Sequence, residues 1–214
     1  MVLRARMSGS SEPVGVPEAK PLLFVISGPS GVGKDAVTDI LKAHDPSRHY
    51  AITATTRQPR PGEQREVHYH FWTVERFEER IADGELLEWA KVYDNYYGVP
   101  KDELRDALRK NADVVLKVDV QGAATIKGLL PQAVLIFLAP HTADELMQRH
   151  YRRRTESPEE LQLRAQMVAT EMAAMSSFDY VVTNKQGELA RAVAQVEAII
   201  SAEKCRVKPN IFTL

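Results

Sequence analysis

The sequence has little cysteine, little excess charge and no long apolar run. Cys205 is the single cysteine among 214 residues, so no internal disulfide can form and a reducing, cytoplasmic setting is expected. The formal net charge of −1 argues against a protein that coats nucleic acid. No stretch approaches the roughly 18 apolar residues that a membrane span requires. These absences predict a soluble globular protein that binds neither nucleic acid nor membranes.

The two ends of the chain differ in composition from the rest. Residues 1–20 are rich in Ser, Pro and Gly, and they contain Arg4 and Arg6 without an apolar segment. This composition is typical of a flexible tail and not of a secretory signal peptide, although it leaves a weak organellar transit peptide open. We expect a second short tail at residues 205–214.

A glycine-rich segment follows the first strongly apolar run, Leu22–Ile26. Residues 28–34 form the pattern G-x-x-x-x-G-K between a predicted buried strand and a predicted helix. In such a loop, backbone N–H groups surround a phosphate, the lysine reaches the β and γ oxygens, and the helix N-terminus adds positive potential. The sequence therefore predicts a phosphate-binding loop formed by Gly28, Pro29, Ser30, Gly31, Val32, Gly33 and Lys34.

Asp35 departs from the usual form of this loop. The residue after the lysine is normally Ser or Thr, whose hydroxyl holds Mg²⁺. A carboxylate also binds Mg²⁺, but it brings negative charge close to the phosphates. Asp35 is therefore a candidate metal ligand whose role the sequence leaves open.

Apolar strands alternate with amphipathic helices along most of the chain. We expect strands near 22–27, 50–53, 67–71, 86–93, 114–118, 133–138 and 180–183, and helices near 33–44, 74–83, 100–110, 121–129, 142–149, 158–175 and 189–202. Strands separated by helices predict an α/β fold with a central parallel sheet covered by helices on both faces. A polar stretch at about 53–99, with a loop at 55–62 and a turn at 96–98, interrupts this rhythm and looks like an insertion with a second substrate site.

Several polar side chains in this stretch could bind an anion. Arg57 and Arg60 lie three residues apart in a proline-stiffened loop, and arginine forks match phosphate oxygens well. Tyr69 and Tyr97 offer hydroxyl donors nearby in the sequence. The alternative is an ordinary solvated basic loop.

Two acidic residues are candidates for recognising a substrate. Glu88 lies between Leu87 and Trp89, and a carboxylate buried there would need partners. Asp119 follows a predicted buried strand, where open α/β sheets bind ligands. Both have plainer interpretations, because Glu88 could face water in an alternating strand and Asp119 could cap the next helix.

A second group of arginines surrounds a predicted link near residues 150–158. It comprises Arg149, Arg152, Arg153, Arg154 and Arg164. Such arginines can neutralise a transferring phosphate and exclude water. They can also simply occupy a solvated helix end, where cations are favoured. The six histidines show no metal-ligand spacing, so we expect them to be structural or exposed.

Taken together, the motifs resemble the guanylate kinase family from about residue 22 to residue 200. The matching segments are Ser27–Lys34, Thr55–Glu63, Tyr69–Phe71, Glu88–Ala90, Asn95–Gly98 and Val118–Gly122. The resemblance implies a P-loop nucleoside monophosphate kinase that makes ADP and GDP from ATP and GMP with Mg²⁺. It also implies a core of residues 21–52, 100–149 and 159–204, a GMP-binding insertion at 53–99 and a lid at 150–158.

The resemblance assigns roles to individual residues on the GMP side. Arg57 and Arg60 would hold the GMP phosphate, and the rest of that phosphate site would be formed by Glu63, Tyr69 and Tyr97. The guanine base would be read by Glu88 and Asp119, which accept from N1–H and the exocyclic amine, and by Thr53, which donates to O6.

On the ATP side, the resemblance implies that residues 28–35 bind the phosphates and that Asn184 lies near the adenine ring. Lys34, Arg57, Arg153 and Arg164 would be the catalytic cations. Use of dGMP, and whether the protein is a monomer or a homodimer, stay open.

The sequence also departs from the family at four positions. Besides Asp35, Lys117 stands where the family usually has Asp or Glu, Val99 replaces a hydroxyl residue, and Arg154 replaces a lid glycine. Lys117 could pair with Asp35 or with phosphate, a partial exchange of charge between the two positions. The competing functions are a ribose bisphosphate kinase on the same scaffold, which shares Gly-Lys-Asp, and a non-catalytic interaction module.

Overall fold

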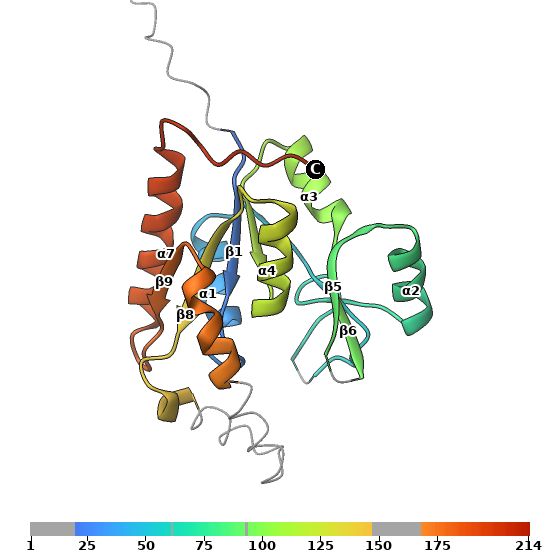
Figure 1. The fold of residues 1–214 in the computed structure, drawn as a ribbon, viewed down its shortest axis with the longest axis horizontal. Helices are drawn as coiled ribbons and strands as arrows, with labels where there is room; N and C mark the ends of the chain where they lie inside the picture. Colours follow the sequence, from blue (N-terminus) through green and yellow to red (C-terminus); the bar gives the residue numbers. More distant parts are fainter. Residues whose placement is uncertain (1–19, 61, 93, 147–167) are drawn as a thin grey trace, which may run out of the picture.

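A five-stranded parallel sheet and the helices that cover it form the larger part of the molecule (Figure 1). The computed structural model describes residues 20–60, 62–92, 94–146 and 168–214. In spatial order, the strands are β2 (His49–Tyr50), β7 (Val114–Lys117), β1 (Leu23–Ser27), β8 (Val134–Ala139) and β9 (Tyr180–Thr183). Every pairing between these neighbours is parallel, which confirms the predicted central sheet.

The side chains of β1 explain why helices cover both faces of this sheet. Phe24 and Ile26 pack in one cluster with α1 (Lys34–His44) and α7 (Leu189–Lys204). Leu23 and Val25 pack on the opposite face with α3 (Lys101–Arg109) and α4 (Val120–Leu129). Successive strand residues point to opposite faces, so a strand buried on both sides must be apolar throughout.

The stretch that interrupts the strand–helix rhythm forms its own sheet beside the first one (Figure 1). Its spatial order is β4 (His70–Phe71), β3 (Ala54–Thr55), β6 (Asn95–Pro100) and β5 (Leu86–Val92), with parallel and antiparallel pairs. Thr73 caps the N-terminus of helix α2 (Val74–Ala82), because its side chain accepts from the N–H of Arg76. Phe77 of α2 packs on Ala54, Trp72 and Leu86, which forms a small second core.

Two predictions about this second sheet are wrong. The strand expected at 67–71 is reduced to β4, because the N–H of His68 donates to the carbonyl of Gln64 (3.1 Å) and Glu66 adopts φ +60°. The turn expected at 96–98 instead lies inside β6, where Tyr96 stacks on Phe77 with ring centroids 5.2 Å apart. Aromatic residues suit a pleated surface that packs on one face, and this packing outweighs the turn signal of Gly98.

The C-terminal residues lie against the parallel sheet. Phe212 is buried among the α3 and α4 side chains, and Ile211 forms a bridge with Leu22. The side-chain amide of Asn210 donates to the buried carboxylate of Glu203 (3.0 Å). The segment expected as a tail is therefore held at residues 210–212, whereas Val207 is 97% exposed.

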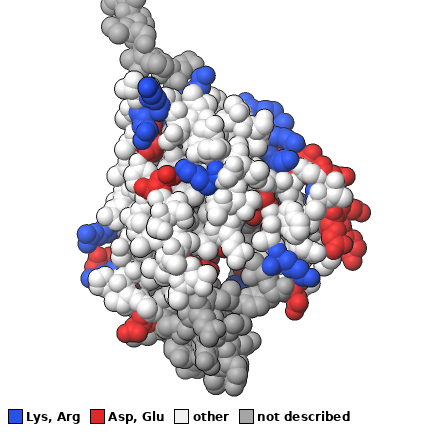
Figure 2. All heavy atoms as spheres, in the orientation of Figure 1, with Lys and Arg blue, Asp and Glu red and all other residues white. Residues whose placement is uncertain are grey.

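Charges of both signs share the surface that Figure 2 shows. A group of acidic side chains gathers at the edge formed by α2, which carries the exposed residues Glu75, Glu78 and Glu79. Among the described residues, no helix is long and apolar enough to cross a membrane.

A partly buried ionic cluster joins the two sheets. The carboxylate of Glu103 on α3 lies 2.8 Å from His49 Nε2 in β2 and 2.9 Å from His70 Nε2 in β4, and it accepts from the N–H of Ile52 (3.1 Å). Although burial opposes its ionisation, these bonds lower the pKa of Glu103 to about 2. Burial alone would disfavour a charged His70, but bonds to Glu103 and the nearby Glu66 raise the pKa of that imidazole.

We expect the substitution Glu103→Gln to destabilise the fold by about 1–3 kcal/mol, because it leaves buried donors with a weaker partner. The ionised Glu103 carboxylate stabilises the fold above its ordinary pKa of 4.5, and this stabilisation is lost as the pH falls toward 2. The protonated His70 imidazole stabilises the fold below its ordinary pKa of 6.5. This stabilisation is lost as the pH rises through the raised pKa of His70 in the folded protein. The difference between variant and wild type should therefore be largest near pH 5–6.

Urea unfolding at pH 3, 5.5 and 9 measures this difference. Glu79→Gln, on the exposed face of α2, serves as the matched control and should change stability by less than about 0.5 kcal/mol. Equal effects of Glu103→Gln at all three pH values would contradict the ionic account.

Candidate functional site

The segment between β1 and α1 forms a tight glycine-rich loop at residues 28–33. Gly28 has φ +137°, and a Cβ there would lie 2.2 Å from the carbonyl oxygen of Leu138, so the loop can pass β8 only without a side chain. Gly33 caps α1 with φ +99°. The loop thus directs the N-terminus of α1 toward the carboxyl edge of the parallel sheet, where anions bind such helix ends.

Lys34 folds back over this loop. Its Nζ donates to the carbonyl oxygens of Gly28 (2.7 Å) and Pro29 (3.2 Å). Burial lowers the pKa of Lys34, and the nearby carboxylates of Glu171, Asp35 and Asp119 oppose that shift. An added anion would stabilise the charged lysine, as a phosphate-binding role requires.

Glu171 also contacts the loop, and the sequence offered no signal for it. The N–H of Ser30 donates to Glu171 Oε2 (3.1 Å), so a carboxylate oxygen takes one of the loop's backbone donors. A backbone N–H that donates to a carboxylate oxygen can equally donate to a phosphate oxygen.

Asn184 holds the loop from the other side. Its side chain is 4% exposed, and its Nδ2 donates to the carbonyl of Val32 (2.8 Å). Its backbone N–H donates to Ala139 at the end of β8 (2.8 Å). Asn184 therefore positions the phosphate loop, while its expected contact with an adenine ring stays a prediction.

Arg57 lies beyond β3, held in a defined orientation by Glu63. The two side chains form a paired salt bridge with N–O distances of 2.9 Å, and the N–H of Arg60 donates to the same carboxylate (2.7 Å). Burial alone would lower the pKa of Arg57, but Glu63 raises it; in return, Arg57 lowers the pKa of Glu63 against the effect of burial. Glu63 thus supports Arg57, and its direct contact with a substrate stays a prediction.

Aromatic rings complete the surroundings of Arg57. Its guanidinium lies 5.5 Å from the centre of the Tyr69 ring and 5.8 Å from that of Phe71. Tyr69 and Tyr97 meet edge to face with centroids 6.5 Å apart. Arg57, Tyr69 and Tyr97 therefore lie together, whereas the Arg60 side chain is exposed.

Glu88 and Asp119 come together above the N-terminus of α4. A Cβ on Gly122 would lie 3.1 Å from Glu88 Oε2 and 3.3 Å from Asp119 Oδ1, so both carboxyl groups border this glycine. Asp119 Oδ1 also accepts from the N–H of Gly122 (2.8 Å), which makes Asp119 the helix cap as well. The two interpretations of Asp119 are compatible, because one of its oxygens caps the helix while the carboxyl group stays beside Glu88.

The alternative in which Glu88 faces water is wrong. Glu88 is 7% exposed, while its neighbour Trp89 is 46% exposed. The β5–β6 pairing shifts register between Leu86 and Glu88, and such an irregularity redirects side chains relative to strict alternation. Burial, together with the charge of Asp119, raises the pKa of Glu88 to about 8, so this carboxyl group is mostly protonated at neutral pH. Thr53, also buried, precedes β3 in the same sheet.

Lys117 pairs with Asp35, one of the two partners that the sequence suggested for it. Lys117 ends β7 and lies opposite Ile26 of β1, close to the start of the phosphate loop. Its Nζ donates to the Asp35 carboxylate and lies 5.3 Å from the centre of the Tyr69 ring. The cation is therefore placed between the loop region and the aromatic site of Arg57.

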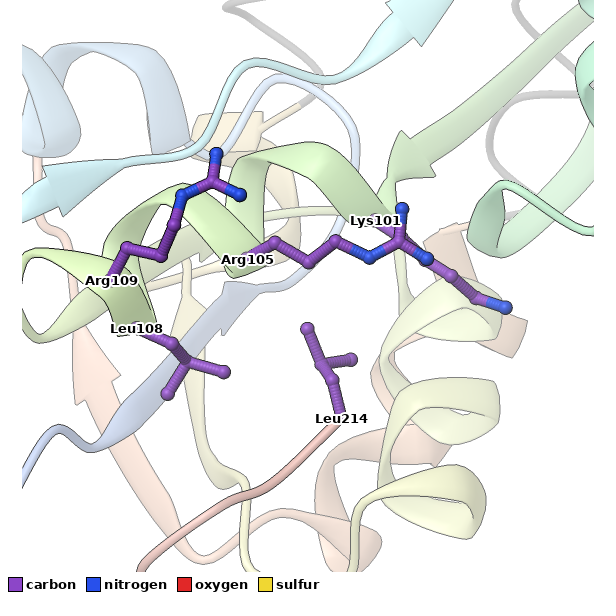
Figure 3. A pocket seen from close by; sticks show the side chains of 5 residues that line it. All are labelled: Lys101, Arg105, Leu108, Arg109 and Leu214. Atoms are coloured by element: carbon purple, nitrogen blue, oxygen red, sulfur yellow. The ribbon is translucent and has the colours of Figure 1, made fainter.

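Two other parts of the chain complete the comparison with the predicted site. Arg153 and Arg164, with the expected lid at 150–158, lie outside the described residues. A pocket of about 450 Å³ lies apart from the predicted site residues (Figure 3) and is lined by Lys101, Arg105, Leu108, Arg109 and Leu214. Its three cations already bond to Gly84, Asp102 and Asp106, respectively, so we do not assign it a ligand.

The fold and the phosphate loop define a P-loop nucleotide-binding protein of the α/β class. Residues 20–203 match the sequence profile of guanylate kinases. The chain is 45% identical over 193 residues to a guanylate kinase from Desulfitobacterium hafniense strain Y51, which covers 89% of this chain and 96% of that protein.

Two further comparisons agree. The chain is 46% identical over 199 residues to guanylate kinase 2, chloroplastic/mitochondrial, from Oryza sativa subsp. japonica, covering 92% of this chain and 70% of that protein. A crystal structure of guanylate kinase from Anaplasma phagocytophilum aligns with a TM-score of 0.70 at 26% identity, covering 89% of each chain. The chain belongs to the guanylate kinase family.

We expect Gly28→Ala to destabilise the protein by more than about 2 kcal/mol, because its Cβ would collide with the Leu138 carbonyl in a left-handed backbone conformation. Gly128→Ala is the matched control, since no atom lies within 4 Å of its added Cβ on helix α4. That change should stabilise by about 0.5–1 kcal/mol. Urea unfolding of both variants tests the pair, and equal stabilities would contradict the proposed loop geometry.

Proposed function

We propose that this guanylate kinase transfers the γ-phosphoryl group of ATP to GMP and releases ADP and GDP. The observation that carries the proposal is the meeting of three groups near one edge of the parallel sheet: the phosphate loop, the Arg57 site and the Glu88–Asp119 carboxyl pair. The first suits a donor triphosphate, the second an acceptor phosphate and the third a base with two adjacent N–H donors.

The donor site would be formed by the loop at 28–34. Lys34 already lies over the loop, and its charge would be favoured by β and γ phosphate oxygens. Mg²⁺ usually binds through one or two carboxylates together with substrate phosphates. Asp35 suits such a role because its carboxylate is 66% exposed in the first turn of α1. When bound, Mg²⁺ would neutralise charge on the transferring phosphate.

The acceptor phosphate would bind at Arg57, Arg60, Tyr69 and Tyr97. Arg57 is already oriented by Glu63 and by the rings beneath it, so little side-chain freedom is lost on binding. Phosphoryl transfer needs alignment and charge neutralisation more than covalent help from the protein. Lys34 and Arg57 would supply part of that charge, and the family resemblance suggests Arg153 and Arg164 for the remainder.

Guanine would be selected by Glu88 and Asp119, with Thr53 at O6. Guanine presents N1–H and an exocyclic amine to these carboxyl groups, whereas adenine has an acceptor at N1 and lacks the 2-amino group. A buried carboxylate left without its donor makes the wrong base costly. This carboxyl pair also favours GMP over ribose bisphosphate as acceptor, because a sugar phosphate would not need it. Lys34, placed to bind phosphate, favours an enzyme over a non-catalytic interaction module.

A coupled assay of ADP release tests the proposal, with GMP, dGMP, AMP, UMP and ribose bisphosphate offered in turn, with and without Mg²⁺. Turnover should require Mg²⁺ and GMP or dGMP. Lys34→Ala should lower kcat by roughly 10²–10³-fold, because it removes a cation from the transferring phosphate. Glu88→Gln should raise KM for GMP far more than KM for ATP. Equal changes in both KM values, or preference for another acceptor, would contradict the assignment.

Binding of guanine should also release a proton. Glu88 has a pKa of about 8 in the empty site, but it must be ionised to accept from guanine donors. GMP affinity should therefore increase by up to about tenfold per pH unit well below pH 8, less steeply as the pH approaches 8, and level off above it. Calorimetry in buffers of different ionisation enthalpy counts the released protons. The Glu88→Gln variant should lose this dependence, and an unchanged proton count in it would contradict the role of Glu88.

A further inference from the structure

Lys117 lies where the two proposed nucleotide sites meet. It ends β7 directly beside β1, with Lys117 in register with Ile26. The phosphate loop begins two residues after Ile26. Parallel strands present their carboxyl ends at one edge, so a side chain that ends β7 is brought near whatever the loop binds.

The surroundings of Lys117 keep it charged. Its Nζ donates to Asp35, and its side chain is only 19% exposed. The Asp35 carboxylate and the ring of Tyr69 both lie beside the ammonium group and favour its charge. Asp35 is 66% exposed, so water screens its charge far more than that of the lysine. Asp35 therefore offsets only part of the attraction that the partly buried Lys117 cation exerts on a nearby phosphate.

The same lysine reaches the acceptor site through Tyr69. Its Nζ lies 5.3 Å from the centre of the Tyr69 ring, and the Arg57 guanidinium lies 5.5 Å from that centre. Two cations thus flank one aromatic ring, one from each sheet. Arg57 is the cation proposed to bind the acceptor phosphate, and Lys117 lies on the same ring.

The negative charge of Asp35 beside the phosphate loop explains why a cation is needed at Lys117. Asp35 follows Lys34 directly, so its negative charge would repel the phosphates that Lys34 attracts. Lys117 neutralises that carboxylate and holds it to one side. Loss of Lys117 would therefore remove a cation from the phosphate sites and also remove one partner of the Asp35 carboxylate.

We propose that Lys117 is a further catalytic residue, a cation that contacts the phosphate groups where the two nucleotides meet, and that Asp35 positions it. This inference rests on the proposed phosphoryl transfer, but it does not depend on which monophosphate is the acceptor.

Four variants test it: Lys117→Met, Lys117→Arg, Asp35→Asn and the double variant Lys117→Met with Asp35→Asn. We expect Lys117→Met to lower kcat about 10²-fold while KM for ATP changes less than about threefold. Lys117→Arg, which keeps the charge, should retain kcat within about tenfold of wild type. Lys127→Met is the matched control, because Lys127 also pairs with an aspartate, Asp179 (2.9 Å), and should stay within about twofold of wild type.

The double variant separates catalysis from folding. Asp35→Asn should lower kcat less in the Lys117→Met background than in wild type, because part of the effect of Asp35 acts through the position of Lys117. Thermal melting of each variant establishes that it is folded. A folded Lys117→Met with wild-type kcat, or losses in the double variant that simply multiply, would overturn the inference.

The same assays distinguish a failure of the proposed function from a failure of the role of Lys117. If wild-type protein phosphorylates an acceptor other than GMP and Lys117→Met still lowers that turnover, the acceptor assignment fails and the role of Lys117 stands. If the wild type phosphorylates none of the acceptors, both fail.

Discussion

The parallel pairing of β1 with β7 is the constraint on which the rest of the site depends. It brings the end of β1, and so the loop at 28–33, beside the end of β7, where Lys117 and then Asp119 follow. This pairing is stable because β1 is apolar on both faces and is covered by helices on each side. Polar groups can then gather at the strand ends without being buried in the core.

Around that edge, charged side chains in the described part of the chain form three pairs. Arg57 is paired with Glu63, Lys117 with Asp35, and Glu88 shares its surroundings with Asp119. The first two pairs hold cations in place before any ligand arrives, which reduces the entropy lost on binding. The third pair is of like charge, so one proton is retained until a suitable donor from a ligand replaces it. The first two pairs therefore preorganise the proposed phosphate sites. The Glu88–Asp119 pair can lose a proton when the proposed base binds.

The second sheet carries the proposed acceptor site, and its attachment to the first sheet is ionic as well as apolar. Glu103 bonds to His49 in one sheet and to His70 in the other. The histidines were expected to be structural or exposed, and these two are structural. The sequence contained no spacing that would place a glutamate of α3 between them, because the three residues come together only through the arrangement of the two sheets.

The sequence by itself determined the phosphate loop, the parallel sheet and most helices, because glycine pattern, continuous apolar strands and helical periodicity are local signals. It also identified Arg57, Tyr69, Glu88, Asp119 and Lys117 as candidates. Only the tertiary structure decided that Glu88 is buried, since a register shift in β5 overrides strict alternation, and that Tyr96 and Tyr97 lie in a strand. It likewise decided the partners of Lys117, Asn184 and Glu171, because hydrogen bonds and ion pairs between distant segments depend on packing that no local pattern encodes.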